Sequence, residues 1–98
     1  MGRVSGQVAL VTCSASGIRR GPSVALAAEG AKVAVTDVDE SGLKETVEII
    51  RKAGGTASSH KQDVTSEERW QEVVAAVKKE FGGLHILVNN AGIGIGAS

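Results

Sequence analysis

The sequence predicts an α/β protein built on part of a doubly wound parallel sheet, with strands and helices alternating in the order βαβαβαβ. Short apolar runs bounded by turn residues alternate along the 98 residues with longer segments whose apolar side chains recur at helical spacing. Helices that separate consecutive strands act as right-handed crossovers between parallel strands. The expected spatial order of the strands is 3-2-1-4, with the first two helices on one face and the third helix on the other.

The first strand and the first helix follow from composition. Val8–Thr12 is a short apolar run between turn residues, which is typical of a buried parallel strand. An alanine-rich helix follows and ends at Gly30, where a left-handed conformation costs little. Pro22 is favourable in the first turn of a helix and disruptive in its interior, so the helix is expected to begin at Pro22, about one turn after Gly17.

The second helix and the two strands beside it come next. Lys32–Asp37 is the second strand, and Asp39 is expected to cap the helix that follows. Thr56–Val64 is polar, which suits a third strand at an edge of the sheet.

The third helix is the clearest amphipathic element. Thr65 and Glu68 have the spacing of a capping box at its start. Its apolar face is formed by Trp70, Val73, Val74, Val77 and Phe81. Leu84–Val88 then supplies the fourth strand. As an apolar edge strand, this segment is expected to favour self-association.

Composition excludes several classes of protein. Eleven basic residues balance eleven acidic residues, so no charge excess points to nucleic acid or to a membrane surface. No apolar run approaches the ~20 residues of a membrane-spanning helix. Cys13 is the only cysteine, which favours a cytoplasmic setting. Together with His60 and His85 it makes no recognisable set of metal ligands, so no metal site is expected.

The turn after the first strand is a candidate phosphate-binding site. A dinucleotide fold needs glycines here because backbone N–H groups must approach the pyrophosphate closely. The candidate cofactor ligands of the turn are Ser14, Ser16, Gly17 and Ile18. Cys13 lies in the same turn, either as a thiol whose pKa a helix N-terminus lowers or as a tolerated small residue. Arg19 and Arg20 could reach a phosphate, although a solvated basic pair is the simpler interpretation.

Asp37 is the candidate residue for recognising the ribose. It ends the second strand, twenty residues after Gly17. A carboxylate in this position can accept hydrogen bonds from the adenosine ribose hydroxyls, and it repels a 2′-phosphate. Asp37 therefore favours NAD over NADP as the cofactor.

Two motifs together resemble those of the short-chain dehydrogenase/reductase (SDR) family. The run Leu87-Val88-Asn89-Asn90-Ala91-Gly92 is similar to the end of the fourth strand in that family. The family's first turn reads Thr-Gly-x-x-x-Gly-x-Gly. Thr12 and Gly17 match this pattern, whereas Cys13 and Arg19 stand in place of the first and third glycines. The resemblance implies a Rossmann-like, NAD(P)-binding domain.

The resemblance also implies roles for residues beyond the first turn. It implies that Asp63 and Val64 contact the adenine. It places Asn90 and Ala91 beside a cofactor ribose, and Gly92 where the chain passes close to the nicotinamide.

In the SDR family the catalytic Ser-Tyr-Lys group follows these strands, and this chain contains no tyrosine. The resemblance therefore implies a partial cofactor-binding domain over residues 1–98, truncated before the catalytic half, with no catalytic residue. We expect an N-terminal fragment of an NAD-dependent oxidoreductase without dehydrogenase activity of its own. Cys13, Arg19 and the late helix start predict weak or absent NAD binding. The alternatives are a non-catalytic nucleotide-binding module, an edge-strand interaction module and a non-functional remnant.

Overall fold

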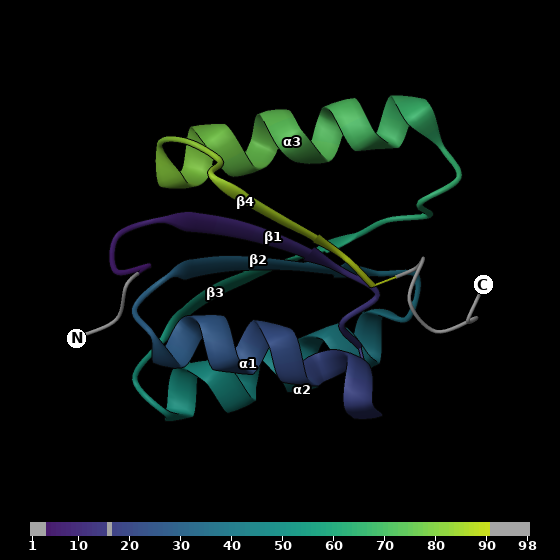
Figure 1. Ribbon diagram of the computed structural model, residues 1–98. Helices are drawn as coiled ribbons and strands as arrows, with labels where there is room; N and C mark the ends of the chain where they lie inside the picture. The colour runs from purple at the N-terminus through teal and green to yellow at the C-terminus, as the bar shows by residue number, and fades with distance from the viewer. Residues whose placement is uncertain (1–3, 16, 91–98) are drawn as a thin grey trace.

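The computed structural model of the chain describes residues 4–15 and 17–90, which form one parallel sheet between two layers of helices. The elements are β1 (Val8–Thr12), the 3₁₀ helix η1 (Gly17–Arg20), α1 (Gly21–Ala28), β2 (Lys32–Asp37), α2 (Glu40–Lys52), β3 (Thr56–Lys61), α3 (Glu67–Phe81) and β4 (Ile86–Asn89). The strand order is β3-β2-β1-β4, with α1 and α2 on one face and α3 on the other (Figure 1). This architecture confirms the predicted fold class and strand order.

The centre of the molecule is β1, whose five residues are all buried. Successive side chains of a strand point to opposite faces of the sheet, so β1 contributes to both layers. Ala9 and Val11 pack on the α1 and α2 side, whereas Val8 and Leu10 pack on the α3 side. A strand buried on both faces needs a continuous apolar run, which explains why β1 was predicted with its correct bounds.

The fourth strand begins two residues later than predicted. The structure gives β4 as Ile86–Asn89, because His85 pairs with β1 partly through its side chain. The backbone N–H of Val8 donates to His85 Nδ1 at 2.9 Å, and the N–H of His85 donates to the Val8 carbonyl at 2.9 Å. The regular ladder starts only after this contact, at the pairing of Ala9 with Ile86.

The cap of α3 also differs from the prediction. The N-cap is Ser66, whose Oγ accepts from the N–H of Arg69 at 3.2 Å. Thr65 lies one residue before this cap, and its N–H and its hydroxyl both donate to Asp63 Oδ1, at 2.9 and 2.7 Å. The predicted apolar face is confirmed, with Val73 and Val77 fully buried against the sheet.

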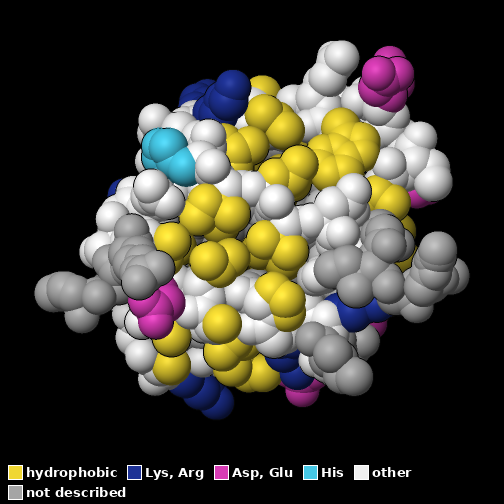
Figure 2. Space-filling view, in the orientation of Figure 1, with side chains coloured by type: hydrophobic (Ala, Val, Ile, Leu, Met, Phe, Trp, Pro, Cys, Tyr) yellow, Lys and Arg dark blue, Asp and Glu magenta, His cyan; other side chains and the backbone are white. Residues whose placement is uncertain are grey.

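The two edges of the sheet differ in character. The edge strand β3 ends at Lys61, three residues before the predicted end, and it is polar. Arg51 Nη2 donates to the Ala57 carbonyl at 3.0 Å and Arg69 Nε donates to the Lys61 carbonyl at 2.8 Å, so two backbone acceptors of this edge are capped. At the opposite edge, Leu87 is 56% exposed. Figure 2 shows hydrophobic side chains gathered over β4 between α1 and α3.

Among the helices of the described residues, none is both long enough and apolar enough to cross a membrane.

Candidate functional site at the carboxyl end of the sheet

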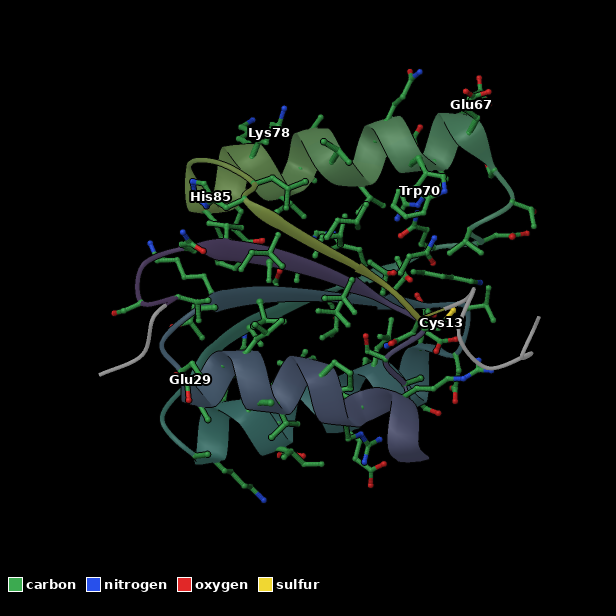
Figure 3. All side chains as sticks on the ribbon, in the orientation of Figure 1. Cys13, Glu29, Glu67, Trp70, Lys78 and His85 are labelled. Atoms are coloured by element: carbon green, nitrogen blue, oxygen red, sulfur yellow. The ribbon has the colours of Figure 1, made fainter. Side chains whose placement is uncertain are left out.

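The carboxyl ends of the four strands lie at one edge of the sheet because all the strands are parallel. In open α/β sheets, ligands bind in the crevice outside these ends. Figure 3 shows Cys13, which follows β1, at this end of the molecule and His85 at the opposite end. Asp37 closes β2 and Asn90 follows β4, so topology brings the first turn, the acid and the asparagine together.

The turn after β1 requires a left-handed backbone at two positions. Cys13 has φ +53° and Gly17 has φ +56°. A side chain in this region costs roughly 1–2 kcal/mol, which glycine avoids. Position 13 is where the SDR pattern has its first glycine, so the structure supplies a physical reason for that preference. Gly17 keeps the residue type that its conformation favours.

Residue 14 is held inside the fold. Ser14 is fully buried and its Oγ donates to the Val11 carbonyl at 2.7 Å. Its N–H donates to the Thr36 carbonyl at 3.0 Å, and its carbonyl accepts from Thr46 Oγ1 at 2.7 Å. Ser14, which was predicted as a cofactor ligand, therefore stabilises the turn from inside the fold, with its hydroxyl bonded to β1.

Asp37 joins the end of β2 to the first turn. Its Oδ2 accepts from the N–H of Ala15 at 3.1 Å. Its Oδ1 accepts from the N–H groups of Val38 at 2.7 Å and Asp39 at 3.2 Å. Three backbone donors therefore orient this carboxylate at the carboxyl end of the sheet, next to the turn.

Asn90 ties β4 to both β1 and η1. Its backbone N–H donates to Thr12 Oγ1 at 3.1 Å, and its side-chain Nδ2 donates to the Arg19 carbonyl at 3.0 Å. The same threonine hydroxyl lies 3.1 Å from Asn89 Oδ1. Asn90 is 3% exposed, so the second asparagine of the motif positions η1 from within the fold.

The segment after β3 forms a tight turn at the same edge of the sheet. The hydrogen bonds that Thr65 donates to Asp63 lower the pKa of this exposed carboxyl. The carbonyl of Val64 accepts from Trp70 Nε1 at 2.8 Å, and Figure 3 shows Trp70 on the side of α3 that faces the sheet. Both predicted adenine contacts therefore lie in an ordered turn.

Three predicted site residues lie outside the described residues, and a fourth is described only in part. The three are Ser16, Ala91 and Gly92. For Ile18 the structure gives the backbone, in η1, but not the side chain.

Cys13 is not an activated thiol. Burial, and next the carboxylate of Asp37, raise the pKa of Cys13, while the charge of Arg19 opposes this shift. A raised thiol pKa leaves less of the reactive thiolate at neutral pH. Of the two interpretations of Cys13, the structure rejects the lowered pKa and supports the tolerated small residue.

The start of the first helix differs in one respect from the prediction. Pro22 lies in the first turn of α1, as expected, and α1 begins at Gly21. However, η1 fills the interval from Gly17 to Arg20, so the chain turns helically from Gly17 onward. A 3₁₀ turn directly before an α-helix keeps backbone donors close to the first turn.

Arg20 is the residue that sequence reasoning missed. Arg19 is exposed, as a solvated residue should be, but the side chain of Arg20 is only 18% exposed. Arg20 Nη2 donates to the Ala15 carbonyl at 2.6 Å, and its Nε donates to Thr46 Oγ1 at 2.8 Å. Nothing in the local pattern distinguishes the two arginines, because these contacts depend on how α2 packs beside the turn.

No three residues among His, Cys, Asp and Glu come close enough to hold a metal ion in the part of the chain that the structure describes. His60 is half-buried on β3, and its Nε2 lies 3.3 Å from Ser58 Oγ and 3.9 Å from Glu80 Oε1. Burial lowers the pKa of His60, against the opposing effect of Glu80.

Three features lie together at the carboxyl end of this parallel sheet: a left-handed turn after β1, an oriented acid at the end of β2 and a buried asparagine after β4. This arrangement is typical of the cofactor site of a dinucleotide-binding α/β domain. The chain belongs to the short chain dehydrogenase family, whose model matches residues 7–98.

Two curated relatives and one solved structure show the extent of the similarity. The chain is 44% identical over 91 residues to 2,5-dichloro-2,5-cyclohexadiene-1,4-diol dehydrogenase LinX of Sphingobium indicum, covering 93% of the chain and 36% of LinX. It is 42% identical over 91 residues to the short-chain dehydrogenase/reductase homolog YusS of Bacillus subtilis, covering 92% of the chain and 84% of YusS. A short chain dehydrogenase/reductase from Burkholderia phymatum in complex with NAD superposes with a TM-score of 0.82 at 33% identity, covering 89% of the chain and 31% of that structure. The chain thus spans about a third of the length of LinX.

Proposed function

We propose that this chain forms the cofactor-binding part of an NAD-dependent short-chain oxidoreductase. The whole enzyme would transfer hydride between the nicotinamide and an alcohol or carbonyl carbon, chemistry that the cofactor supplies. The observation that carries this proposal is the oriented carboxylate of Asp37 beside the turn at Gly17. The chain has no tyrosine to serve as the family's acid/base, so we propose that it has no dehydrogenase activity alone.

The residues at this edge fit the adenosine end of a dinucleotide. A carboxylate can accept about four hydrogen bonds. Asp37 accepts three from backbone N–H groups, so it can accept one more from a ribose hydroxyl. The N–H groups of η1 lie beyond Gly17, where backbone donors suit a pyrophosphate. The charge of Asp37 opposes a 2′-phosphate, which favours NAD over NADP.

The affinity for NAD is expected to be low, with a dissociation constant of about a millimolar or weaker, near −4 kcal/mol. Cys13 stands where the turn favours glycine, and α1 begins four residues after Gly17. Titration followed by two-dimensional NMR measures binding in this range. NAD should shift the amide signals of Ala15 and Asp37, and NADP should bind more weakly.

Two variants make this titration specific. Asp37→Asn should remove the preference for NAD over NADP, whereas Glu48→Gln, at an exposed acid on α2, should leave it unchanged. A micromolar dissociation constant would refute the low affinity. The absence of any amide shift with NAD would overturn the proposed function itself.

A second candidate function is association with another copy of the chain through β4. The difference between the two edges supports it, because arginines cap backbone carbonyls of β3 while β4 presents an exposed leucine. An apolar strand at the edge of a sheet readily pairs with another strand. We therefore propose that the isolated chain forms a dimer in which two β4 strands lie side by side.

Replacing Leu87 by lysine should convert the dimer to a monomer, since a charge on the open edge opposes pairing. Analytical ultracentrifugation over a range of concentrations measures this. Ser59→Lys introduces the same charge on the opposite edge strand, β3, and should leave the dimer intact. A wild-type chain that is monomeric throughout that range would rule out the association.

A further inference from the structure

Arg20 reaches back from the end of η1 to the turn that precedes it. Its Nη2 lies 2.6 Å from the Ala15 carbonyl, the shortest of its hydrogen bonds, and 2.9 Å from Glu45 Oε1. Its Nε lies 2.8 Å from Thr46 Oγ1. The planar guanidinium fork can hold such partners in fixed directions at once, which a lysine ammonium cannot do.

The peptide units on either side of Ala15 are held by different groups. The unit between Ser14 and Ala15 is fixed at both ends, because its carbonyl accepts from Thr46 and its N–H donates to Asp37. The carbonyl of the next unit accepts from Arg20. A trans peptide unit is planar, so a fixed carbonyl sets the plane of the chain that continues toward Gly17.

The first turn of α2 lies directly against the same carbonyl. A Cβ on Gly42 would come within 2.6 Å of the Ala15 carbonyl oxygen and 2.8 Å of the Ala15 Cβ. Arg20 and Gly42 therefore act on one atom, the first by a charge-assisted hydrogen bond and the second by leaving space. This gives two independent ways to disturb the turn without touching Asp37.

We propose that Arg20 is a positioning residue for the dinucleotide: it sets the first turn so that the backbone donors after Gly17 face the pyrophosphate. This inference rests on the proposed cofactor-binding function. Arg20 acts through the Ala15 carbonyl, and its ion pair with Glu45, whose side chain is 67% exposed, adds little stability. The pyrophosphate contacts depend on Arg20, whereas the ribose contact depends on Asp37.

The test compares NAD with adenosine, which keeps the ribose and lacks the pyrophosphate. Arg20→Lys should weaken NAD binding about tenfold, as loss of a charge-assisted hydrogen bond predicts, and leave adenosine binding within about twofold of wild type. Gly42→Ala should show the same selectivity. Arg51→Lys, at an arginine that donates to the Ala57 carbonyl near the amino end of β3, is the matched control and should change neither affinity. All affinities are measured by NMR titration of the 98-residue chain, with urea unfolding to establish that each variant is folded.

The outcomes separate the two proposals. If wild type binds NAD and Arg20→Lys weakens NAD and adenosine equally, or weakens neither, Arg20 is not a positioning residue for the pyrophosphate and the cofactor site stands. If wild type binds neither NAD nor adenosine, the proposed function fails and the role of Arg20 fails with it. A selective loss of NAD binding in Arg20→Lys, with the control unchanged, supports the inference.

Discussion

Glycine in place of Cys13 is expected to stabilise the fold by about 1 kcal/mol, because the residue no longer carries a side chain in the left-handed region. The backbone of Cys13 has φ +53°, and its thiol makes no hydrogen bond that the substitution would remove from the described structure. Greater freedom of glycine in the unfolded chain offsets part of the gain. Urea unfolding measures the change as a higher midpoint at constant slope.

The matched control is Cys13→Ala, which removes the sulfur and keeps the Cβ that the left-handed backbone disfavours. Alanine should leave the midpoint unchanged or lower it. If alanine stabilises the chain as much as glycine does, the cost lies in the partly buried thiol, and the account of backbone strain is wrong.

Leu10→Ala is expected to destabilise the fold by about 2–5 kcal/mol, since it removes a fully buried side chain and leaves a cavity. Leu10 lies on β1 and packs on the α3 side with Val73 and Val77. Domains of this size are stable by only about 5–15 kcal/mol, so the loss is a large fraction of the total stability. Circular dichroism during thermal unfolding gives the loss in the transition temperature.

Leu87 provides an internal comparison for Leu10. The two leucines are direct partners in the register of β1 with β4, yet Leu10 is 0% exposed and Leu87 is 56% exposed. Leu87→Ala should change stability by about 0.5 kcal/mol or less when measured on the monomer. Equal losses at the two positions would mean that β4 is buried in solution to an extent that the structure does not show.

The sequence predicted β1 and β2 with correct bounds because strands buried on both faces require continuous apolar runs. The ends of helices and strands were predicted less well where adjacent residues could serve equally well as the cap or the first residue. Thr65 and Ser66 are both good caps, but in the structure Ser66 accepts from the N–H of Arg69 while Thr65 donates to Asp63. The start of β4 depended on a contact between His85 and Val8, 77 residues apart, which no local pattern can reveal.

The candidate site was predictable to the extent that topology determines it. Parallel strands bring their carboxyl ends together, so Gly17, Asp37 and Asn90 could be assigned to one edge from their positions after β1, β2 and β4. The contacts of Arg20 could not be predicted, because its partner Thr46 lies 26 residues away on a different helix. The burial of Ser14 could not be predicted either, because its backbone hydrogen bonds are to Thr36 and Thr46, which are distant in the sequence.

The unequal edges of the sheet limit how far an assembly of these chains can grow. When two chains pair through β4 about a two-fold axis, their sheets join into one. The two edge strands of the combined sheet are then both β3. Arginines already occupy two carbonyls there, which opposes the addition of a third copy in the same way. A pair joined in this way should therefore extend into a filament less readily than a sheet whose two edges are both uncapped. Arg51 and Arg69 would then protect the chain against aggregation.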